Sequence, residues 1–273
     1  MLMKTNKWLI LLLLVFCQCA NENKETLEVP EAPEECETIQ YDELITISCG
    51  TYFPEVSDKY IYPIVPGTVE WQQVKTLDDA YQVSQLPDDV LKSISTPGLI
   101  DALIHAHMFI GFYFFTVPSS NWIAYYVLFN SAIELYTRKD AGKALTAYYK
   151  LVKLDCILSS ISSNYGEGKE EYRRLSGLEC LFTKQEILDT MDHETKKEAV
   201  ASLLAHSRLN WDWVRICPMA HIMLADQYEP IVKYSRENVE EFNLTLMAYG
   251  YPSNPNQYEI IVSFAKDFIN VIN

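Results

Sequence analysis

The hydrophobic pattern of the chain is helical from Thr68 to the C-terminus. Apolar residues recur every three or four positions, which places them along one face of an α-helix. The connections between these segments are short, and no strand pattern interrupts them after Pro66. The clearest apolar stripe is in the final segment and comprises Ile260, Ile261, Phe264, Phe268, Val271 and Ile272. The sequence therefore predicts an all-α domain in which neighbouring helices are antiparallel.

Helix start signals divide this region into separate predicted helices. Thr76 with Asp79, and Thr183 with Glu186, have the spacing of a capping box, in which two side chains satisfy two backbone N–H groups. Other residues expected to cap or open helices are Pro87, Thr96, Pro97, Ser120, Asp140, Asp192 and Pro218. The predicted helices cover 77–83, 88–94, 98–109, 121–138, 141–161, 170–182, 184–191, 193–211, 219–235, 237–248 and 257–272.

Two arrangements of these helices fit the pattern. Helix pairs could stack as an α-solenoid of the HEAT or armadillo kind. A compact irregular array is the alternative, because the chain shows no fixed sequence period.

The first nineteen residues have the order of a bacterial lipoprotein signal. Lys4 and Lys7 precede an apolar run over 8–16, and two cysteines follow it at once. A cysteine thiolate is the nucleophile that can accept an acyl group. We expect lipid on Cys19, with Cys17 as the alternative, and a protein exported and anchored to the bacterial envelope, facing the periplasm or the cell surface. An ordinary cleaved secretory signal is the other interpretation, because about nine apolar residues are too few to span a bilayer.

The sequence then divides into three parts. Residues 20–37 are rich in glutamate and poor in apolar residues, which predicts a flexible acidic tether. Residues 38–66 are rich in Tyr, Ile, Val and Pro, and we expect an extended arm that lies across the helical body. Residues 67–273 form the predicted helical domain.

Charge and cysteine content restrict the kinds of partner and site. The formal net charge of −15 repels phosphate backbones, so we expect no nucleic-acid partner. A Cys36–Cys49 disulfide is one expectation for an oxidising exterior, and separate small buried cysteines are the alternative. No pair of the seven cysteines has CxxC spacing, and the chain carries no phosphate-binding or dinucleotide motif, so the sequence indicates no cofactor.

The histidines are the best candidates for chemistry. His105 and His107 lie in a predicted helix, where side chains two positions apart diverge, so they are not expected to share a metal. His206 and His221 lie on successive predicted helices and could meet Asp226 in a divalent transition-metal site. The alternative is that the two histidines are separate polar positions, with His206 half-exposed and His221 packed on a tryptophan.

The densest aromatic stretch of the chain is 108–129. Its side chains could form a ligand surface, with Tyr113, Trp122, Tyr125 and Tyr126 as the anchors. The alternative interpretations are hydrophobic core, where two helices meet at a Pro-Ser-Ser turn, and contact with a membrane.

Three stretches resemble an uncharacterised family of secreted bacterial proteins and lipoproteins: Tyr62–Trp71, Gln85–Ile104 and Phe129–Val152. The resemblance implies export and a helical body, and it implies no activity. Together with the residues above, it favours a lipid-anchored helical module that binds an envelope protein or a glycan, rather than an enzyme. The alternative function is a hydrolase of envelope or environmental polymers that uses His206, His221 and Asp226 as a metal or acid/base set.

Overall fold

The computed structural model describes residues 50–107, 129–163, 167–207, 213–240, 242 and 255–271. All of them belong to the second of two compact units into which the chain divides, Ile47–Asn273. The described residues form twelve α-helices, one 3-10 helix and no strand. This part of the chain is therefore all-α, as the hydrophobic pattern predicts.

The first helices begin where local signals predict. After the 3-10 helix η1 (Glu70–Gln73), α1 (Leu77–Gln82) has the predicted capping box, with both the Thr76 and the Asp79 bonds formed. Pro87 is the N-cap of α2 (Asp88–Ser93). The N-cap of α3 (Thr96–His105) is Ser95, whose side chain accepts a hydrogen bond from Gly98 N. The caps at Thr76 and Ser95 are bonds between near neighbours in sequence, which sequence patterns detect well, whereas α2 begins at Pro87 without a side-chain capping bond.

The described part of the predicted arm, 50–66, contains no helix or strand. Its Phe53 and Tyr62 side chains are buried against the helices. The Tyr62 hydroxyl donates to the carbonyl oxygen of Ala102 in α3 over 3.0 Å. These contacts hold this segment against the helical body.

The middle of the unit differs from the sequence prediction. The single helix expected over 141–161 is two helices, α7 (Ala141–Lys150) and α8 (Leu154–Ser163), separated by Leu151–Lys153. Asp140 makes no capping bond and instead accepts a hydrogen bond from the Thr96 hydroxyl over 2.8 Å. The other helices here are α6 (Asn130–Thr137), α9 (Glu167–Leu181) and the short α10 (Gln185–Leu188).

The predicted capping box at Thr183 is wrong. The N-cap of α10 is Lys184, with no side-chain capping bond. The Thr183 hydroxyl donates to the carbonyl oxygen of Cys180, at the end of α9. A threonine hydroxyl can bond to the turn before it or cap the helix after it, and the Thr183 hydroxyl bonds to the preceding turn.

The C-terminal helices are α11 (His193–Ala205), α12 (Trp213–Ala225), α13 (Glu229–Glu237) and α15 (Pro255–Asn270). Asp192 caps α11 as predicted, because its side chain accepts a hydrogen bond from Thr195 N over 2.7 Å. Pro218 lies inside α12 and does not begin a helix. The segment expected to form one helix over 219–235 is divided at 226–228, where Gln227 adopts a left-handed backbone conformation.

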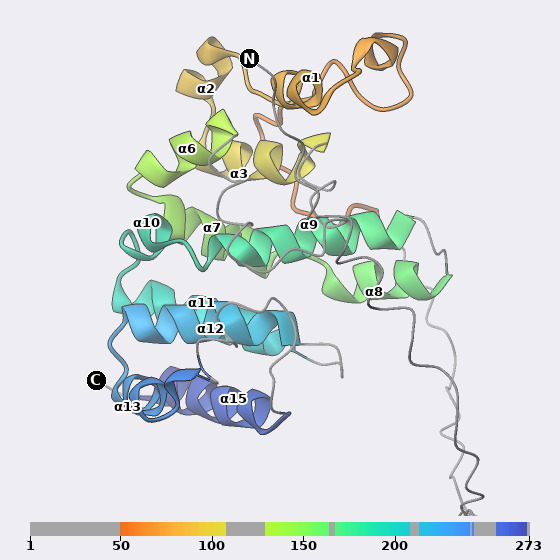
Figure 1. The fold of residues 1–273 in the computed structure, drawn as a ribbon. Coiled ribbons are helices and arrows are strands. Elements are labelled where there is room, and N and C mark those ends of the chain that lie inside the picture. The colour runs from red at the N-terminus through yellow and green to blue at the C-terminus, as the bar shows by residue number, and fades with distance from the viewer. Residues whose placement is uncertain are drawn as a thin grey trace, which may run out of the picture. The chain divides into compact units, whose positions relative to one another are not determined.

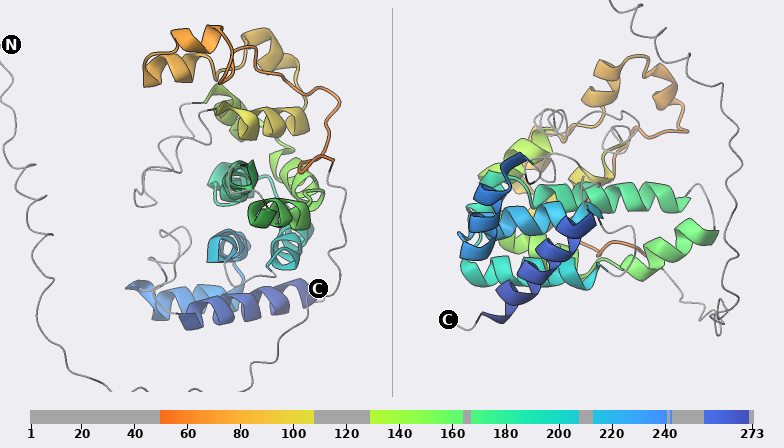
Figure 2. Two further views of the ribbon diagram at one scale, coloured as in Figure 1. Left: turned by 90° about the vertical axis from the view of Figure 1, so that its right-hand side faces the viewer. Right: turned by 60° about the horizontal axis from the view of Figure 1, so that its bottom comes forward.

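The helices pack in successive layers (Figure 1). Helix α3 packs against α6, α7 and α9; α7 and α9 in turn pack against α11 and α12, respectively. Helix α15 covers α11 and α12 on the other side, as the further views also show (Figure 2). The largest side chains buried between these layers are Tyr149, Phe129, Phe182, Phe242 and Phe268.

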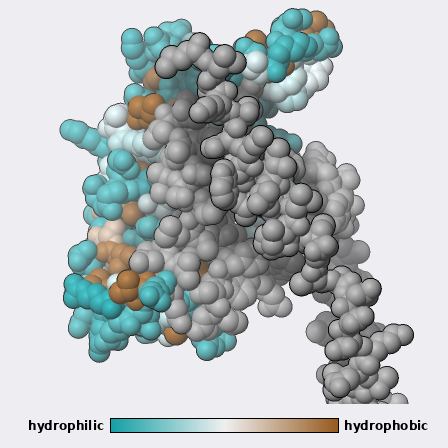
Figure 3. Space-filling model, viewed as in Figure 1, coloured by the Kyte–Doolittle hydropathy of each residue, from teal (hydrophilic) through white to brown (hydrophobic). Residues whose placement is uncertain are grey.

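The exposed apolar residues do not form one continuous surface in the visible described part of Figure 3, where they occur as small patches among hydrophilic ones. Isolated exposed apolar side chains are normal in folded proteins. Within the described ranges, no helix has the length and apolar character needed to cross a membrane.

Candidate functional site

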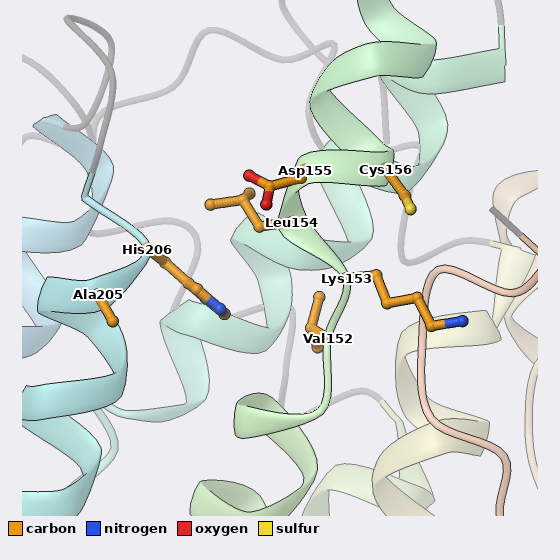
Figure 4. A pocket seen from close by; sticks show the side chains of 7 residues that line it. All are labelled: Val152, Lys153, Leu154, Asp155, Cys156, Ala205 and His206. Carbon is orange, nitrogen blue, oxygen red and sulfur yellow. The ribbon is translucent and has the colours of Figure 1, made fainter. Parts of the chain in front are cut away.

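A pocket of about 400 Å³ opens where the α7–α8 connection meets the C-terminal end of α11 (Figure 4). The side chains of Leu154 and Asp155 point toward α11, and the imidazole of His206 points toward the connection. Lys153 and Cys156 point to the opposite side of the connection. The lining residues are Val152, Lys153, Leu154, Asp155, Cys156, Ala205 and His206.

The break between α7 and α8 forms one wall of this pocket. Leu151 N and Val152 N donate to the carbonyl oxygens of Tyr148 and Tyr149, which closes α7 with a tight turn. Lys153 N then donates to the carbonyl oxygen of Tyr52 in the arm over 2.9 Å. A continuous helix would have used that N–H internally, so the arm helps to set the path of the connection.

His206 forms the opposite wall and is the C-cap residue of α11. Its backbone N–H donates to the carbonyl oxygen of Ser202 over 3.2 Å. Its ring packs against the ring of Tyr149 in a tilted arrangement, with 4.8 Å between centroids and 57° between planes. This contact fixes the imidazole between the pocket and the buried interior.

Beneath His206 lies a buried polar group that the sequence analysis missed. The Tyr149 hydroxyl donates to Glu179 Oε1 over 2.7 Å, and Arg215 Nε donates to the same oxygen over 2.8 Å. The three side chains come from α7, α9 and α12 and are almost completely buried. Burial, with the negative charge of Glu179, raises the pKa of Tyr149 well above its usual value, so this hydroxyl stays protonated and donates.

The residues of the predicted metal set lie in different surroundings. His206 faces the pocket, whereas Asp226 Oδ2 lies 2.6 Å from Nδ1 of His193, a histidine that the sequence analysis did not single out. Lys196 Nζ is 3.5 Å from the other Asp226 oxygen. Among the described residues, which include all three members of the set, no group of three or more His, Cys, Asp or Glu side chains is arranged to hold a metal ion.

His221 lies on α12 and is partly buried. Burial, with the nearby positive charge of Lys184, lowers the pKa of His221 to about 4. The imidazole is therefore neutral at pH 7, and it packs against its neighbours without the cost of partly burying a charge.

A second cluster of ionisable groups surrounds Asp101 in α3. Asp101 is buried. Its Oδ1 accepts a hydrogen bond from the Tyr148 hydroxyl over 2.8 Å and lies 3.3 Å from His105 Nδ1. Its Oδ2 has no hydrogen-bond partner and lies 4.0 Å from Lys59 Nζ. His105 Nδ1 also bonds to the Asp101 carbonyl oxygen over 2.8 Å. Burial lowers the pKa of His105 even though Asp101 opposes this effect. The i, i+4 spacing of Asp101 and His105 on one helix is a signal that sequence reasoning could have used.

The remaining predicted site residues lie outside the described ranges. They are Tyr113, Trp122, Tyr125 and Tyr126 in the aromatic run, the lipidation candidates Cys17 and Cys19, and the cysteines Cys36 and Cys49.

Comparison with known proteins assigns no family to this chain. No protein-family model, curated protein or solved structure matches it. The resemblance to secreted bacterial proteins over Tyr62–Trp71, Gln85–Ile104 and Phe129–Val152 therefore stays a prediction.

Proposed function

We propose that this protein is an exported, lipid-anchored helical module whose pocket beside His206 binds a peptide segment of an envelope protein. The observation that carries the proposal is the pocket itself. Its volume of about 400 Å³ lies within the range of ligand-binding sites. Its lining combines apolar side chains with the acidic Asp155 and the imidazole of His206.

This lining suits a peptide better than a purely apolar ligand. Val152, Leu154 and Ala205 offer apolar contacts to a side chain, Asp155 offers a negative charge and His206 offers an imidazole. Charge complementarity of this kind selects partners and fixes their register more than it adds affinity. The buried group of Tyr149, Glu179 and Arg215 supports His206 from behind, so the wall is held in place before a ligand arrives.

We extend the proposal to the architecture. The succession of α3, then α7 and α9, then α11 and α12, then α15 is the layering expected of a short α-solenoid of the HEAT or armadillo kind. In such arrays each layer contacts its neighbours, and the ends of the helices offer binding surfaces. The pocket lies at such helix ends, between the layer of α7 and the layer of α11.

The binding proposal is tested with a charge reversal at the pocket. The full chain carrying Asp155→Lys is compared with wild type for the recovery of envelope proteins after chemical cross-linking in intact cells. Lys92→Glu, which changes an exposed lysine of α2, is the control. We expect one partner to be lost only from the pocket variant. An unchanged set of cross-linked proteins would contradict the proposal.

The anchor is tested separately by metabolic labelling with a fatty acid. We expect label on the wild-type protein, and loss of label in Cys19→Ser but not in Cys17→Ser. Label that is lost only in Cys17→Ser would move the lipid to that residue, and no label on wild type would leave a secreted protein without an anchor.

A hydrolase remains the second candidate function, and the cluster at Asp101 is the observation that favours it. Asp101 holds Nδ1 of His105, an arrangement that directs Nε2 to act as a base. We expect any hydrolysis of envelope polysaccharide or peptide by the full chain to be abolished in His105→Gln and kept in His221→Gln. Equal activity in both variants would exclude His105 as the base.

A further inference from the structure

Cys156 in the first turn of α8 is disulfide-bonded. The other two cysteines of the described helices, Cys180 in α9 and Cys217 in α12, are buried as thiols. The partner of Cys156 is therefore one of the four cysteines that precede residue 50, namely Cys17, Cys19, Cys36 and Cys49.

The path of the arm distinguishes between these four. Tyr52 is bonded to Lys153 through its carbonyl oxygen over 2.9 Å, which brings the beginning of the described arm to the beginning of α8. Cys49 lies three positions before Tyr52, and Cys156 lies three positions after Lys153. A disulfide requires Cα atoms about 4.4–6.8 Å apart. Three residues of chain span at most roughly 11 Å, so the Cα atom of Cys49 lies within that distance of Tyr52. Cys49 can therefore come within disulfide distance of Cys156 with little movement of the chain.

The other cysteines are less suitable partners. Cys36 is separated from Tyr52 by a much longer stretch of chain, and the entropic cost of closing a loop grows with its length. Cys17 and Cys19 are further still, and a cysteine that carries lipid on sulfur has no thiol to oxidise. The direction of the side chain agrees with this choice, because Cys156 points to the side of the connection that faces away from His206 (Figure 4).

We propose that Cys49 and Cys156 form a disulfide that fixes the arm, and with it the membrane tether, to the helical body beside the pocket. The bond forms between the two Sγ atoms by thiol–disulfide exchange. Each thiol loses its proton, and the electron pair reduces the disulfide of a protein oxidant, which is released as two thiols. An exported protein meets such oxidants, so the pairing agrees with the proposed localisation.

The bridge has a structural consequence for the pocket. It holds the arm at Cys156, so that the bond between Tyr52 and Lys153 stays formed and the α7–α8 connection keeps its path. The pocket wall made by Val152 and Leu154 follows from that path. Reduction of the bridge is therefore expected to loosen the wall as well as the tether.

The test is a disulfide map of the full chain, isolated from its native compartment with free thiols alkylated at once. Cleavage after Glu, Lys and Arg places Cys49 in the fragment 44–55, Cys156 in 154–167, and Cys36 in a separate fragment. We expect 44–55 and 154–167 to be joined before reduction and separate after it. A link from 154–167 to any other fragment, or an alkylated Cys156 in the unreduced protein, would overturn the proposal.

Two variants give a matched comparison. In Cys49→Ser, Cys156 should become fully alkylated without a reductant, whereas in Cys36→Ser it should stay protected as in wild type. The reverse result would assign the bridge to Cys36. The map does not depend on lipid attachment: the bridge can be found on a chain without lipid, and fatty-acid labelling can succeed when the bridge is absent.

Discussion

The buried group of Glu179, Arg215 and Tyr149 allows a sharp test of the interior, through the substitution Glu179→Gln. Glutamine has nearly the shape of glutamate, and its amide oxygen can still accept from the Tyr149 hydroxyl and from Arg215 Nε, which both bond to Oε1. The change therefore removes mainly the negative charge that faces the buried guanidinium.

The expected loss is large because solvent does not screen the pair. The side chain of Glu179 is 1% exposed and that of Arg215 is 3% exposed. Removing one partner of a buried ion pair costs about 3–5 kcal/mol, because it leaves the other charge without compensation. Domains are typically stable by about 5–15 kcal/mol, so this variant should be close to its limit of stability. Tyr149→Phe removes only one hydrogen bond to a charged acceptor and should cost about 1.5–3 kcal/mol.

The assay is urea unfolding of the full chain followed by far-ultraviolet circular dichroism. Glu198→Gln is the control, since Glu198 pairs with Lys150 at a surface where both side chains are about half exposed, and such pairs contribute at most about 1 kcal/mol. The double variant Glu179→Gln/Arg215→Met removes both charges and should recover much of the lost stability. A Glu179→Gln variant as stable as the control, or a double variant that shows no recovery, would refute the reasoning.

Three further predictions concern pH, packing and capping. The pKa of His221 is about 4 in the fold and about 6.5 in the unfolded chain, so His221 binds a proton more readily when the protein is unfolded. The free energy of unfolding is therefore expected to fall as pH decreases from about 6.5 toward 4. The loss from this residue should be about 2 kcal/mol between pH 7 and pH 5, and His221→Gln should flatten the dependence in urea unfolding at the two pH values. Gly142→Ala places a Cβ 2.3 Å from Met191 Cγ and 3.1 Å from the Ile187 carbonyl oxygen, so it should lower the free energy of unfolding by about 1–3 kcal/mol; an unchanged urea midpoint would show that the site can expand. Asp192→Ala should speed amide hydrogen exchange in the first turn of α11, while Asp192→Asn, which can still accept from Thr195 N, should not; equal rates in the two variants would contradict the cap.

The sequence determined the features that depend on near neighbours. Apolar spacing specified an all-α body, and the caps at Thr76 and Asp192 were predictable because a side chain and the N–H group it bonds lie three residues apart. The last helix, α15, followed from its apolar stripe alone. Such bonds form in an isolated helix as well as in the folded protein, so they can be recognised from residues a few positions apart in a single sequence.

The tertiary structure decided where groups with the same local chemistry bond to residues distant in sequence instead of to near neighbours. Asp140 is a residue type that commonly caps helices, but its carboxylate accepts a hydrogen bond from the Thr96 hydroxyl, which is distant in sequence. The helix expected over 141–161 breaks at Leu151–Lys153, where Lys153 N bonds to Tyr52 of the arm. The pocket lies at that break, so no pattern within 141–161 could have located it. The group of Tyr149, Glu179 and Arg215 was likewise hidden, because its members come from three helices and meet only when the layers pack.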